Sequence, residues 1–485
     1  MLSPLGHTVR THSKKPKKLR ESVPVRDMPK TGIVPTGPSN SFTMKYSLIL
    51  SSMLFLLSIP HTYGQAILSL DEAIQEALAN NHQIKIQKSA LQATALQADP
   101  AMVGLKPVIN LNAGYELGWA DASIETLSLN PEAPPSEPLE LSGWSNDITL
   151  APEISLLLMD GKASRYRLDQ LRVGTDLAQL QVQQAIEETI TEVTFAYLDL
   201  AQQQQQLQIT EQSIALGQDR LNRARQDASY GTSGSLQELQ IQVDVMADSA
   251  ALRNQLLEYE NRQRDLNQLI GRSPDQVFQV SEDLILQTNL ELKDLEKEMA
   301  DNNVALRVQE QRIRLADLGI QTAQAANKPQ LQAYGNVSYA YFQNEASFLT
   351  TNRAVGPNVG LRFSYPIADG GARRIREQVA VLEKEQRSLE QSDTRLQLQK
   401  ELHNAYARYR NGLEQLRIEE TNLALFERNL TNLENRFRLG TATLTEVRSA
   451  QLNLAAANNR IAANRFNVKR AEITLYLLSG QISTF

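Results

Sequence analysis

Cysteine is absent from the 485 residues of this chain. Its absence excludes disulfide bonds, metal sites built from thiolates and an N-terminal lipid carried by a cysteine. Histidine is scarce as well: outside residues 1–64 only His82 and His403 occur, far apart and without neighbouring ligand residues. The chain also lacks a glycine-rich loop followed by Lys-Ser or Lys-Thr, which would hold nucleotide phosphates. We therefore expect no cofactor, no bound metal and no enzyme activity.

Apolar residues make up an ordinary 41% of the chain, which excludes both a disordered chain and a helical protein with many membrane spans. Near the N-terminus, the apolar stretch from Leu48 to Ile59 is too short to cross a bilayer. It follows the basic start Met44–Lys45 and precedes the small residues Thr62 and Gly64. This order is typical of a secretory signal peptide over residues 44–64, cleaved after Gly64.

A signal peptide is not expected to begin at residue 44. We interpret residues 1–43 as an upstream extension from a misassigned start codon; an unusually long basic leader is the alternative. Residues 1–64 carry nine basic and two acidic residues, a charge of +7, so the rest of the chain carries −6 − 7 = −13. This acidic charge argues against nucleic acid as a partner. An exported, acidic chain without cysteine is expected in the cell envelope or outside the cell.

The chain after the signal peptide contains the same landmarks twice. They are a Lys-Pro pair, an Asp-Gly pair and a glycine break, at Lys106–Pro107 and Lys328–Pro329, Asp160–Gly161 and Asp369–Gly370, and Gly231 and Gly440. The first pair is offset by 328 − 106 = 222 residues and the others by 209, which predicts a longer loop in the first copy, over residues 130–143. We therefore divide the chain into a first repeat, 65–290, and a second, 291–485.

Each repeat is predicted to contain a helix of about 35 residues, two short alternating segments, a very long helix, the glycine break and a shorter helix. Apolar residues recur every seven positions in the long segments, which is typical of coiled-coil packing. Examples are Ile186, Val193, Leu200, Leu207, Ile214 and Leu221. The long helices are expected over 162–229 and 372–439, each roughly 100 Å at 1.5 Å per residue. The glycine breaks then form the turns of two helical hairpins, because glycine readily takes the positive φ that ends a helix.

Four segments alternate apolar and polar residues, at 107–119, 146–158, 329–342 and 358–367. Each has about ten to fourteen residues with aromatic side chains near its ends, which favours strands of a membrane β-barrel over the alternative, a soluble sheet buried on one face. Four strands cannot close a barrel that spans a membrane. We therefore expect several copies to pool their strands and helices in a closed ring with cyclic symmetry.

With these features in place, the chain resembles the TolC family of outer-membrane efflux proteins. The resemblance is carried by the doubled unit, by the Lys-Pro and Asp-Gly pairs, and by the segment FRLGTATLTEVRSAQ, residues 437–451, which is similar to the family's hairpin-tip motif. It implies a mostly α fold with a membrane β-barrel. Coiled-coil hairpins would form a periplasmic α-barrel, and four strands from each of three chains would form one shared 12-stranded barrel.

The resemblance further implies a homotrimer in the outer membrane that extends into the periplasm and contacts outer-membrane lipid. An equatorial layer would come from residues near 271–295 and from the chain ends. The hairpin tips would dock a periplasmic adaptor protein, which connects to an inner-membrane pump. The trimer itself would be a passive, gated exit duct.

Several residues receive candidate roles. For the docking tips these are Gly231, Leu236, Gly440 and Leu444; for the periplasmic gate Glu446 and Glu238; and for structural caps between strand and helix Asp160, Gly161, Asp369 and Gly370. Leu236 and Leu444 would pack against adaptor tips or make ordinary capping contacts. Glu446 would line the gate or be a solvated surface residue, and Glu238 is its counterpart only if one residue is inserted. A second acid and an arginine of the family's gate would fall at Ser449 and Ala442, and both are absent here.

The leading interpretation is the exit duct of a tripartite efflux system. The exit channel of a type I secretion system has the same expected fold and differs only in its partners. A structural coiled-coil protein of the envelope, with a small soluble sheet and no channel, is the alternative from another class. The alternating segments that end in tyrosine and tryptophan argue against it, because a coiled-coil spacer does not need them.

Overall fold

The computed structural model describes residues 67–124, 137–229, 235–282, 284–347 and 349–482. The chain divides into two units between Gly64 and Gln65, and all described residues belong to the second. The leader, the signal peptide and Gly231 lie outside the described residues.

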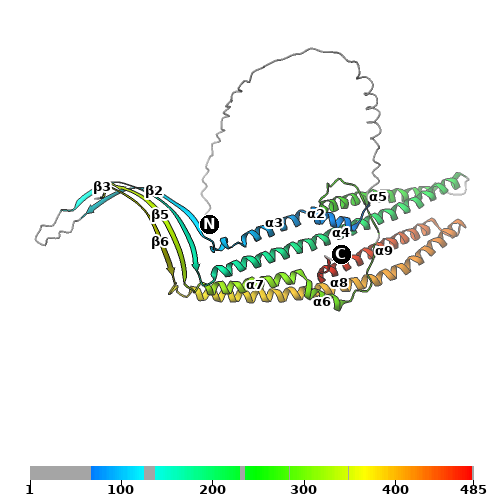
Figure 1. Ribbon diagram of the computed structural model, residues 1–485. Helices are drawn as coiled ribbons and strands as arrows, with labels where there is room; N and C mark the ends of the chain where they lie inside the picture. The colour runs from blue at the N-terminus through cyan, green and yellow to red at the C-terminus, as the bar shows by residue number, and fades with distance from the viewer. Residues whose placement is uncertain (1–66, 125–136, 230–234, 283, 348, 483–485) are drawn as a thin grey trace, which may run out of the picture. The chain divides into compact units, whose positions relative to one another are not determined.

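The elements of this unit follow the same order in its two halves (Figure 1). The first half comprises β1 (Ile67–Leu68), α2 (Leu70–Asn80), α3 (His82–Gln97), the 3₁₀ turn η1 (Pro100–Val103), β2 (Val108–Ile124), β3 (Leu139–Met159), α4 (Ala163–Ser229) and α5 (Ser235–Ile270). After the short strand β4 (Gln279–Val280), the second half comprises α6 (Leu292–Asn302), α7 (Val304–Ala325), β5 (Gln330–Asn344), β6 (Thr351–Ser364), α8 (Ala372–Arg438) and α9 (Leu444–Ser479).

The two long helices are confirmed. Helices α4 and α8 have 67 residues each, and each packs against the shorter helix that follows it, α4 against α5 and α8 against α9. In the second hairpin Gly440 ends the long helix with a φ of +73°. The Gly440 N–H donates to the Phe437 carbonyl and the Thr441 N–H to the Arg436 carbonyl, both at 2.9 Å. These bonds satisfy carbonyls that the end of a helix leaves unpaired.

The single helix of about 35 residues expected at the start of each repeat is wrong, because an asparagine interrupts it. Asn81 separates α2 from α3, and Asn303 separates α6 from α7. The Oδ1 atom of Asn303 accepts hydrogen bonds from the N–H groups of Ala305 and Leu306 at 3.0 and 3.2 Å, so it caps α7. The Oδ1 atom of Asn81 caps α3 in the same way.

Each asparagine also joins its helix break to a distant helix end. The Nδ2 atom of Asn81 donates to the carbonyl of Leu269 at 3.1 Å, and that of Asn303 to the carbonyl of Leu478 at 2.9 Å. The glycine that follows each of these helix ends has a positive φ, and a Cβ on Gly480 would lie 2.7 Å from the backbone of Asn302. Only glycine fits both the conformation and the contact at this junction.

The main apolar clusters lie around these junctions. One cluster includes the fully buried side chains of Phe278, Leu266 and Ile270, and the other those of Tyr409, Leu402 and Leu475. The segment between α5 and α6 connects the two halves and is held on α9 by Lys469 and Glu472. These two buried residues of α9 form an ion pair whose nitrogen and oxygen lie 2.8 Å apart. The Lys469 Nζ donates to the carbonyl of Ile285, and Glu472 accepts the Gln287 N–H, so both buried charges also have hydrogen-bond partners.

The four longer strands form one antiparallel sheet in the order β2-β3-β5-β6. All four strands are longer than predicted: β2 and β3 have 17 and 21 residues, and β5 and β6 have 15 and 14. Strand β6 begins at Thr351 and ends at Ser364, so it starts before the predicted segment 358–367 and stops short of its end. Residues 139–143, expected in a loop, belong to β3, because the ladder with β2 continues to the pair Ile124–Leu139 and satisfies the backbone there. Trp119 and Trp144 stack edge to face on this extension, with ring centroids 5.3 Å apart.

No helix among the described residues is long and apolar enough to cross a membrane.

Substitution of Asn303 tests the junction. We expect Asn303→Ala to lower the free energy of unfolding by about 1–3 kcal/mol, because it removes a helix cap and leaves the Leu478 carbonyl unpaired. Denaturant unfolding followed by circular dichroism measures this change. Asn432→Ala, on an exposed turn of α8, is the matched control and should leave stability within about 0.5 kcal/mol. Equal stability of the two variants would contradict the assigned role.

Candidate functional site

The candidate gate residue Glu446 belongs to a capping box at the start of α9. Its carboxylate accepts hydrogen bonds from the Thr443 N–H at 2.6 Å and from the Thr443 hydroxyl at 2.9 Å, and its own N–H donates to that hydroxyl at 3.3 Å. The bonds from the backbone and side chain of Thr443 lower the pKa of Glu446 below its ordinary value. The exposed carboxylate is therefore held in its charged form by its own helix.

The described part of the first hairpin tip presents Leu236 and Glu238. Leu236 is 76% exposed. Glu238, in the first turn of α5, forms an ion pair with Arg225 of α4, with a nitrogen–oxygen distance of 3.0 Å. This contact lies within the first hairpin, so the environments of Glu238 and Glu446 differ.

Leu444 joins the two hairpins. It follows the Thr443 cap of α9 and packs on a cluster formed by both helices of the first hairpin. The buried members of that cluster are Leu221, Ala224, Ile241 and Val245. This contact with the first hairpin was included in neither interpretation of Leu444.

An ion pair that was not predicted from the sequence lies one turn beyond Leu444 along α9 and links the same hairpins. Arg448 of α9 donates two hydrogen bonds to the carboxylate of Asp248 on α5, at 2.9 and 2.7 Å, and its Nε lies 3.6 Å from Asp244. The Arg448 and Asp248 side chains are only 16% and 20% exposed. The hydrogen bond to Asp248 raises the pKa of Arg448. In the sequence, the only sign of this ion pair is the i, i+4 spacing of Asp244 and Asp248. The same spacing also occurs on ordinary helix faces that are exposed to solvent.

A pocket of about 210 Å³ lies beside this ion pair, between the hairpins. Its lining includes Asp248, Arg448, Leu430 and Gln451. Both polar atoms of the Gln451 amide are buried and have no hydrogen-bond partner among the described residues. At the contact between the hairpins, the Arg448 guanidinium therefore has hydrogen-bond partners, whereas the Gln451 amide has none in the described part of the structure.

The candidate caps lie where strands lead into the long helices. Asp160 accepts the Ser164 N–H at 2.6 Å, and Asp369 accepts the Arg373 N–H at 2.9 Å. Asp369 also contacts the guanidinium groups of Arg373 and Arg376, at 3.2 and 3.4 Å. Gly161 and Gly370 turn the chain between each aspartate and its helix, with φ values of +65° and +66°.

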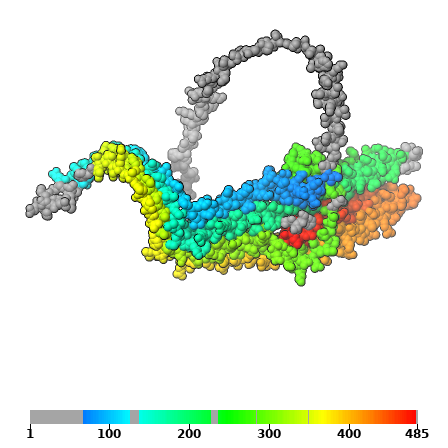
Figure 2. Space-filling view, viewed as in Figure 1, coloured from blue at the N-terminus to red at the C-terminus, as the bar shows by residue number. Residues whose placement is uncertain are grey.

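One face of the sheet is apolar across all four strands, because the register places apolar residues side by side. One row consists of Ile109, Ile154, Gly335 and Val359, and another of Ala113, Leu150, Tyr339 and Val355. The large residues of these rows are exposed in the single chain. In the space-filling view no helix covers the face of the sheet that is turned to the viewer (Figure 2).

The opposite face of the sheet is polar. Asn110, Glu153, Asn336 and Asn358 form one row across the four strands. The Asn358 amide donates to the Asn336 side chain at 3.1 Å. The two faces of the sheet therefore suit two different solvents, one apolar and one aqueous.

The sheet and the helices end at corresponding edges. Strands β2 and β6 are the edges of the sheet. Packing between helices runs from α3 through α4 and α7 to α8 near the sheet, and from α5 through α4 and α9 to α8 near the tips. Exposed apolar residues line both outer helices, namely Leu236, Leu239, Val243 and Met246 on α5, and Ile375, Val379, Leu382, Leu389 and Leu396 on α8.

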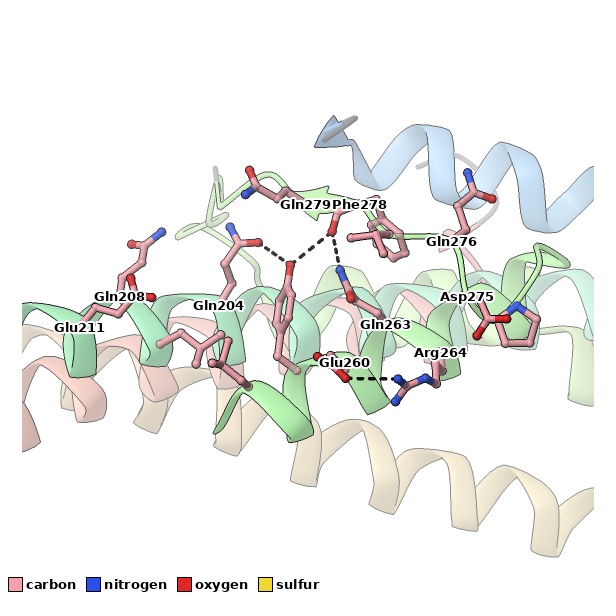
Figure 3. Close-up of a pocket in the computed structure, with 15 residues that line it drawn as sticks. Gln204, Gln208, Glu211, Glu260, Gln263, Arg264, Asp275, Gln276, Phe278 and Gln279 are labelled. Carbon is pink, nitrogen blue, oxygen red and sulfur yellow. Dashed lines mark hydrogen bonds and ion pairs between the residues drawn. The ribbon is translucent and has the colours of Figure 1, made fainter. Parts of the chain in front are cut away.

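A larger pocket of about 620 Å³ forms where residues 274–279 lie across α4 and α5 (Figure 3). Its polar groups bond mainly to each other: the Tyr259 hydroxyl contacts the side chain of Gln204 at 3.1 Å and the carbonyl of Phe278 at 3.4 Å, and Gln263 donates to the same carbonyl. We interpret these groups as the attachment of the segment to the hairpin. No cluster of three or more histidine or acidic side chains suited to a metal occurs in the described ranges.

Comparison with known proteins identifies one family and a shared fold. The family model described as outer membrane efflux protein matches residues 73–272 and 295–481. Comparison with curated protein sequences finds no match.

Solved outer-membrane channels have a similar structure. The outer-membrane channel OprN has a TM-score of 0.69 and 18% identity, with 85% of this chain and 90% of OprN covered. The outer membrane protein VceC of Vibrio cholerae has a TM-score of 0.66 and 17% identity over 85% of this chain and 96% of VceC. The CmeC outer membrane channel of Campylobacter jejuni has a TM-score of 0.67 and 15% identity over 85% and 86%. At these identities the likeness concerns the fold, and it confirms the predicted class of long helical hairpins with four longer strands.

Substitution of Asp248 tests the ion pair between the hairpins. We expect Asp248→Asn to raise the rate of amide hydrogen exchange at the start of α9 about tenfold, because a charge-assisted contact worth about 1.5 kcal/mol is lost. Hydrogen exchange with mass spectrometry measures this rate peptide by peptide. Glu419→Gln is the control, since Glu419 pairs with Arg460 inside the second hairpin. If Glu419→Gln accelerates hydrogen exchange in the same peptides as much as Asp248→Asn does, the ion pair between the hairpins has no special role.

Proposed function

The chain belongs to the outer membrane efflux protein family, and on that premise we propose that three copies assemble into one gated channel, the exit duct of an efflux system. The observation that carries this proposal is the matching of open edges: β2, α3 and α5 at one side of the chain, and β6 and α8 at the other. A single chain leaves the backbone groups of both edge strands unpaired and its apolar helix faces uncovered.

A head-to-tail ring would pair both sets of edges at once. In such a ring β6 of one copy lies beside β2 of the next, and α8 lies beside α3 and α5. Four strands are too few for a closed barrel, and three copies supply twelve. The apolar face of the sheet then meets the membrane, and the row that contains Glu153 and Asn336 lines an aqueous lumen. The proposed trimer therefore satisfies the sheet edges and the apolar face together.

The helical hairpins would extend into the periplasm and carry the adaptor and the gate. We assign adaptor docking to the tips around Gly231 and Gly440, with the exposed Leu236 as one contact. The adaptor would connect the trimer to an inner-membrane pump that supplies the energy. Leu444 instead supports the packing of the second hairpin on the first.

The gate, in this proposal, is closed by the ion pair of Arg448 with Asp248 rather than by the family's missing acid and arginine. This pair and Leu444 hold the second hairpin against the first near its tip. The three Glu446 carboxylates of a trimer would add negative charge at the constriction, because hydrogen bonds from Thr443 favour their charged form.

We also propose that residues 65–290 and 291–485 are two copies of one structural unit. The two asparagine junctions support this division, since each pairs a helix break with the end of the last helix in the same half. Whether the duct serves efflux or type I secretion depends on its partners; the family description favours efflux. A coiled-coil spacer would have no use for the aligned apolar rows of the sheet.

The oligomeric state tests the proposed assembly. We expect residues 65–485, extracted from outer membrane in detergent, to have the mass of a trimer by light scattering after subtraction of the detergent. Leu389→Ser, on the outer face of α8, should weaken the trimer, whereas Leu216→Ser on the interior helix α4 should not. A monomer or dimer that needs no detergent would exclude the channel and favour the envelope spacer.

Conductance across a planar bilayer tests the gate. Arg448→Gln should raise the conductance of the trimer several-fold, because it frees the second hairpin from Asp248. Arg460→Gln, which breaks an ion pair within the second hairpin, should leave conductance unchanged. Equal effects of the two substitutions would show that Arg448 does not hold the gate.

A further inference from the structure

We infer that Arg353 and Tyr341 form a binding site for the phosphate group of a lipid, on the apolar face of the sheet. The inference rests on the proposed function, because it requires this face to meet the membrane. It is carried by the position of Arg353 on the sheet, by its contact with Tyr341 and by the polar residues beside it.

On β6, Arg353 lies just beyond the last apolar residue of this face. Along β6 the residues of the apolar face run from Val355 to Phe363, a stretch of nine residues. A strand of a membrane β-barrel is tilted and needs about 9–11 residues to cross the apolar part of the bilayer. Arg353 is the next residue on the same face, at the end of β6 away from helix α8. This position corresponds to the level of the lipid headgroups.

The guanidinium group of Arg353 is held by an aromatic ring. Tyr341 lies directly opposite Arg353 in the β5–β6 ladder, and the guanidinium carbon lies 5.5 Å from the centre of its ring. Among the residues that the structure describes, Arg353 has no hydrogen bond and no ion pair. Its N–H donors are therefore available to an external acceptor.

Polar side chains continue the site toward the outer end of the strands. Gln343 lies directly opposite Thr351, one step from the Tyr341–Arg353 pair on the same face. The Tyr341 hydroxyl donates to the Gln343 side chain at 3.2 Å. We call these four residues the headgroup patch. The amide and hydroxyl groups add neutral donors beside the single positive charge.

A phosphorylated lipid matches both parts of this surface. The planar guanidinium binds phosphate oxygens through two parallel hydrogen bonds. The acyl chains of the same molecule would lie along the apolar rows that begin at Val355. Free phosphate has the same headgroup chemistry but no apolar part, so the lipid is the favoured source.

Arg362 provides a matched control on the same strand. It also lies over a tyrosine ring, 5.2 Å from the centre of Tyr334. Arg353 and Arg362 are nine residues apart, so they point to opposite faces of the sheet, and Arg362 lies on the polar face.

Native mass spectrometry of the full chain, extracted from membrane in detergent, tests the site. The probes are dioctanoyl phosphatidic acid, dioctanoylglycerol as its counterpart without phosphate, and inorganic phosphate. We expect Arg353→Gln to bind phosphatidic acid about tenfold more weakly than wild type, and Arg362→Gln to bind it as wild type does. Dioctanoylglycerol should bind all three chains equally, and inorganic phosphate should not displace the lipid.

Unchanged binding by Arg353→Gln, or an equal loss in Arg362→Gln, would overturn the site. Displacement of the lipid by inorganic phosphate at the same concentration would overturn the lipid as its ligand. If Arg353→Gln does not assemble, Tyr341→Leu keeps the charge but removes its support and should still weaken binding severalfold. A wild-type chain that needs no detergent refutes the proposed function itself, whereas a normal trimer with unchanged lipid binding refutes only the headgroup patch.

Discussion

The constraint on which the rest of this structure depends is the pairing of backbone groups at the edges of a four-stranded sheet. Strands β2 and β6 each present one row of N–H and C=O groups that none of the described strands pairs. In a membrane such groups have no water to bind, so an open sheet is not stable there. The helices also lack a partner at their outer positions, since apolar residues of α5 and α8 remain exposed there. Sheet and helices thus require a partner on the same two sides.

Helices of 67 residues are kept in place by contacts concentrated near their middle. The breaks at Asn81 and Asn303 let the first helix pair of each half bend onto the end of α5 or α9. Around each break the backbone donors and acceptors find partners, and the neighbouring clusters bury large apolar side chains. The connecting segment at Ile285 and Gln287 is held by Lys469 and Glu472, a buried pair that hydrogen bonds complete. These hydrogen bonds and the ion pair favour one position of the connecting segment on α9, because apolar contacts are less specific in direction than hydrogen bonds.

Near the hairpin tips, one small apolar cluster and one ion pair join the two hairpins. Leu444, close to the tip, packs on a small apolar cluster of the first hairpin, and one turn farther from the tip Arg448 and Asp248 form a bidentate ion pair. Within the described part of the chain, neither polar atom of the Gln451 amide has a hydrogen-bond partner. A contact that depends on one ion pair and one small cluster is more easily separated than a continuous apolar core. The proposed gate therefore lies where one small apolar cluster and one ion pair, and not a large apolar core, hold the hairpins together.

Local pattern in the sequence determined the long helices, the four principal strands and the glycine turn at Gly440, because heptads, alternation and positive φ act over neighbouring residues. Tertiary structure alone decided the helix breaks at Asn81 and Asn303, whose partners Leu269 and Leu478 lie 188 and 175 residues away. It also decided the length of β3, which depends on pairing with β2, and the ion pair of Arg448 with Asp248, 200 residues apart. Arg353 reads in the sequence as one basic residue in a strand. Its place opposite Tyr341 follows from the register of the sheet, because register is a relation between strands and no single strand contains it.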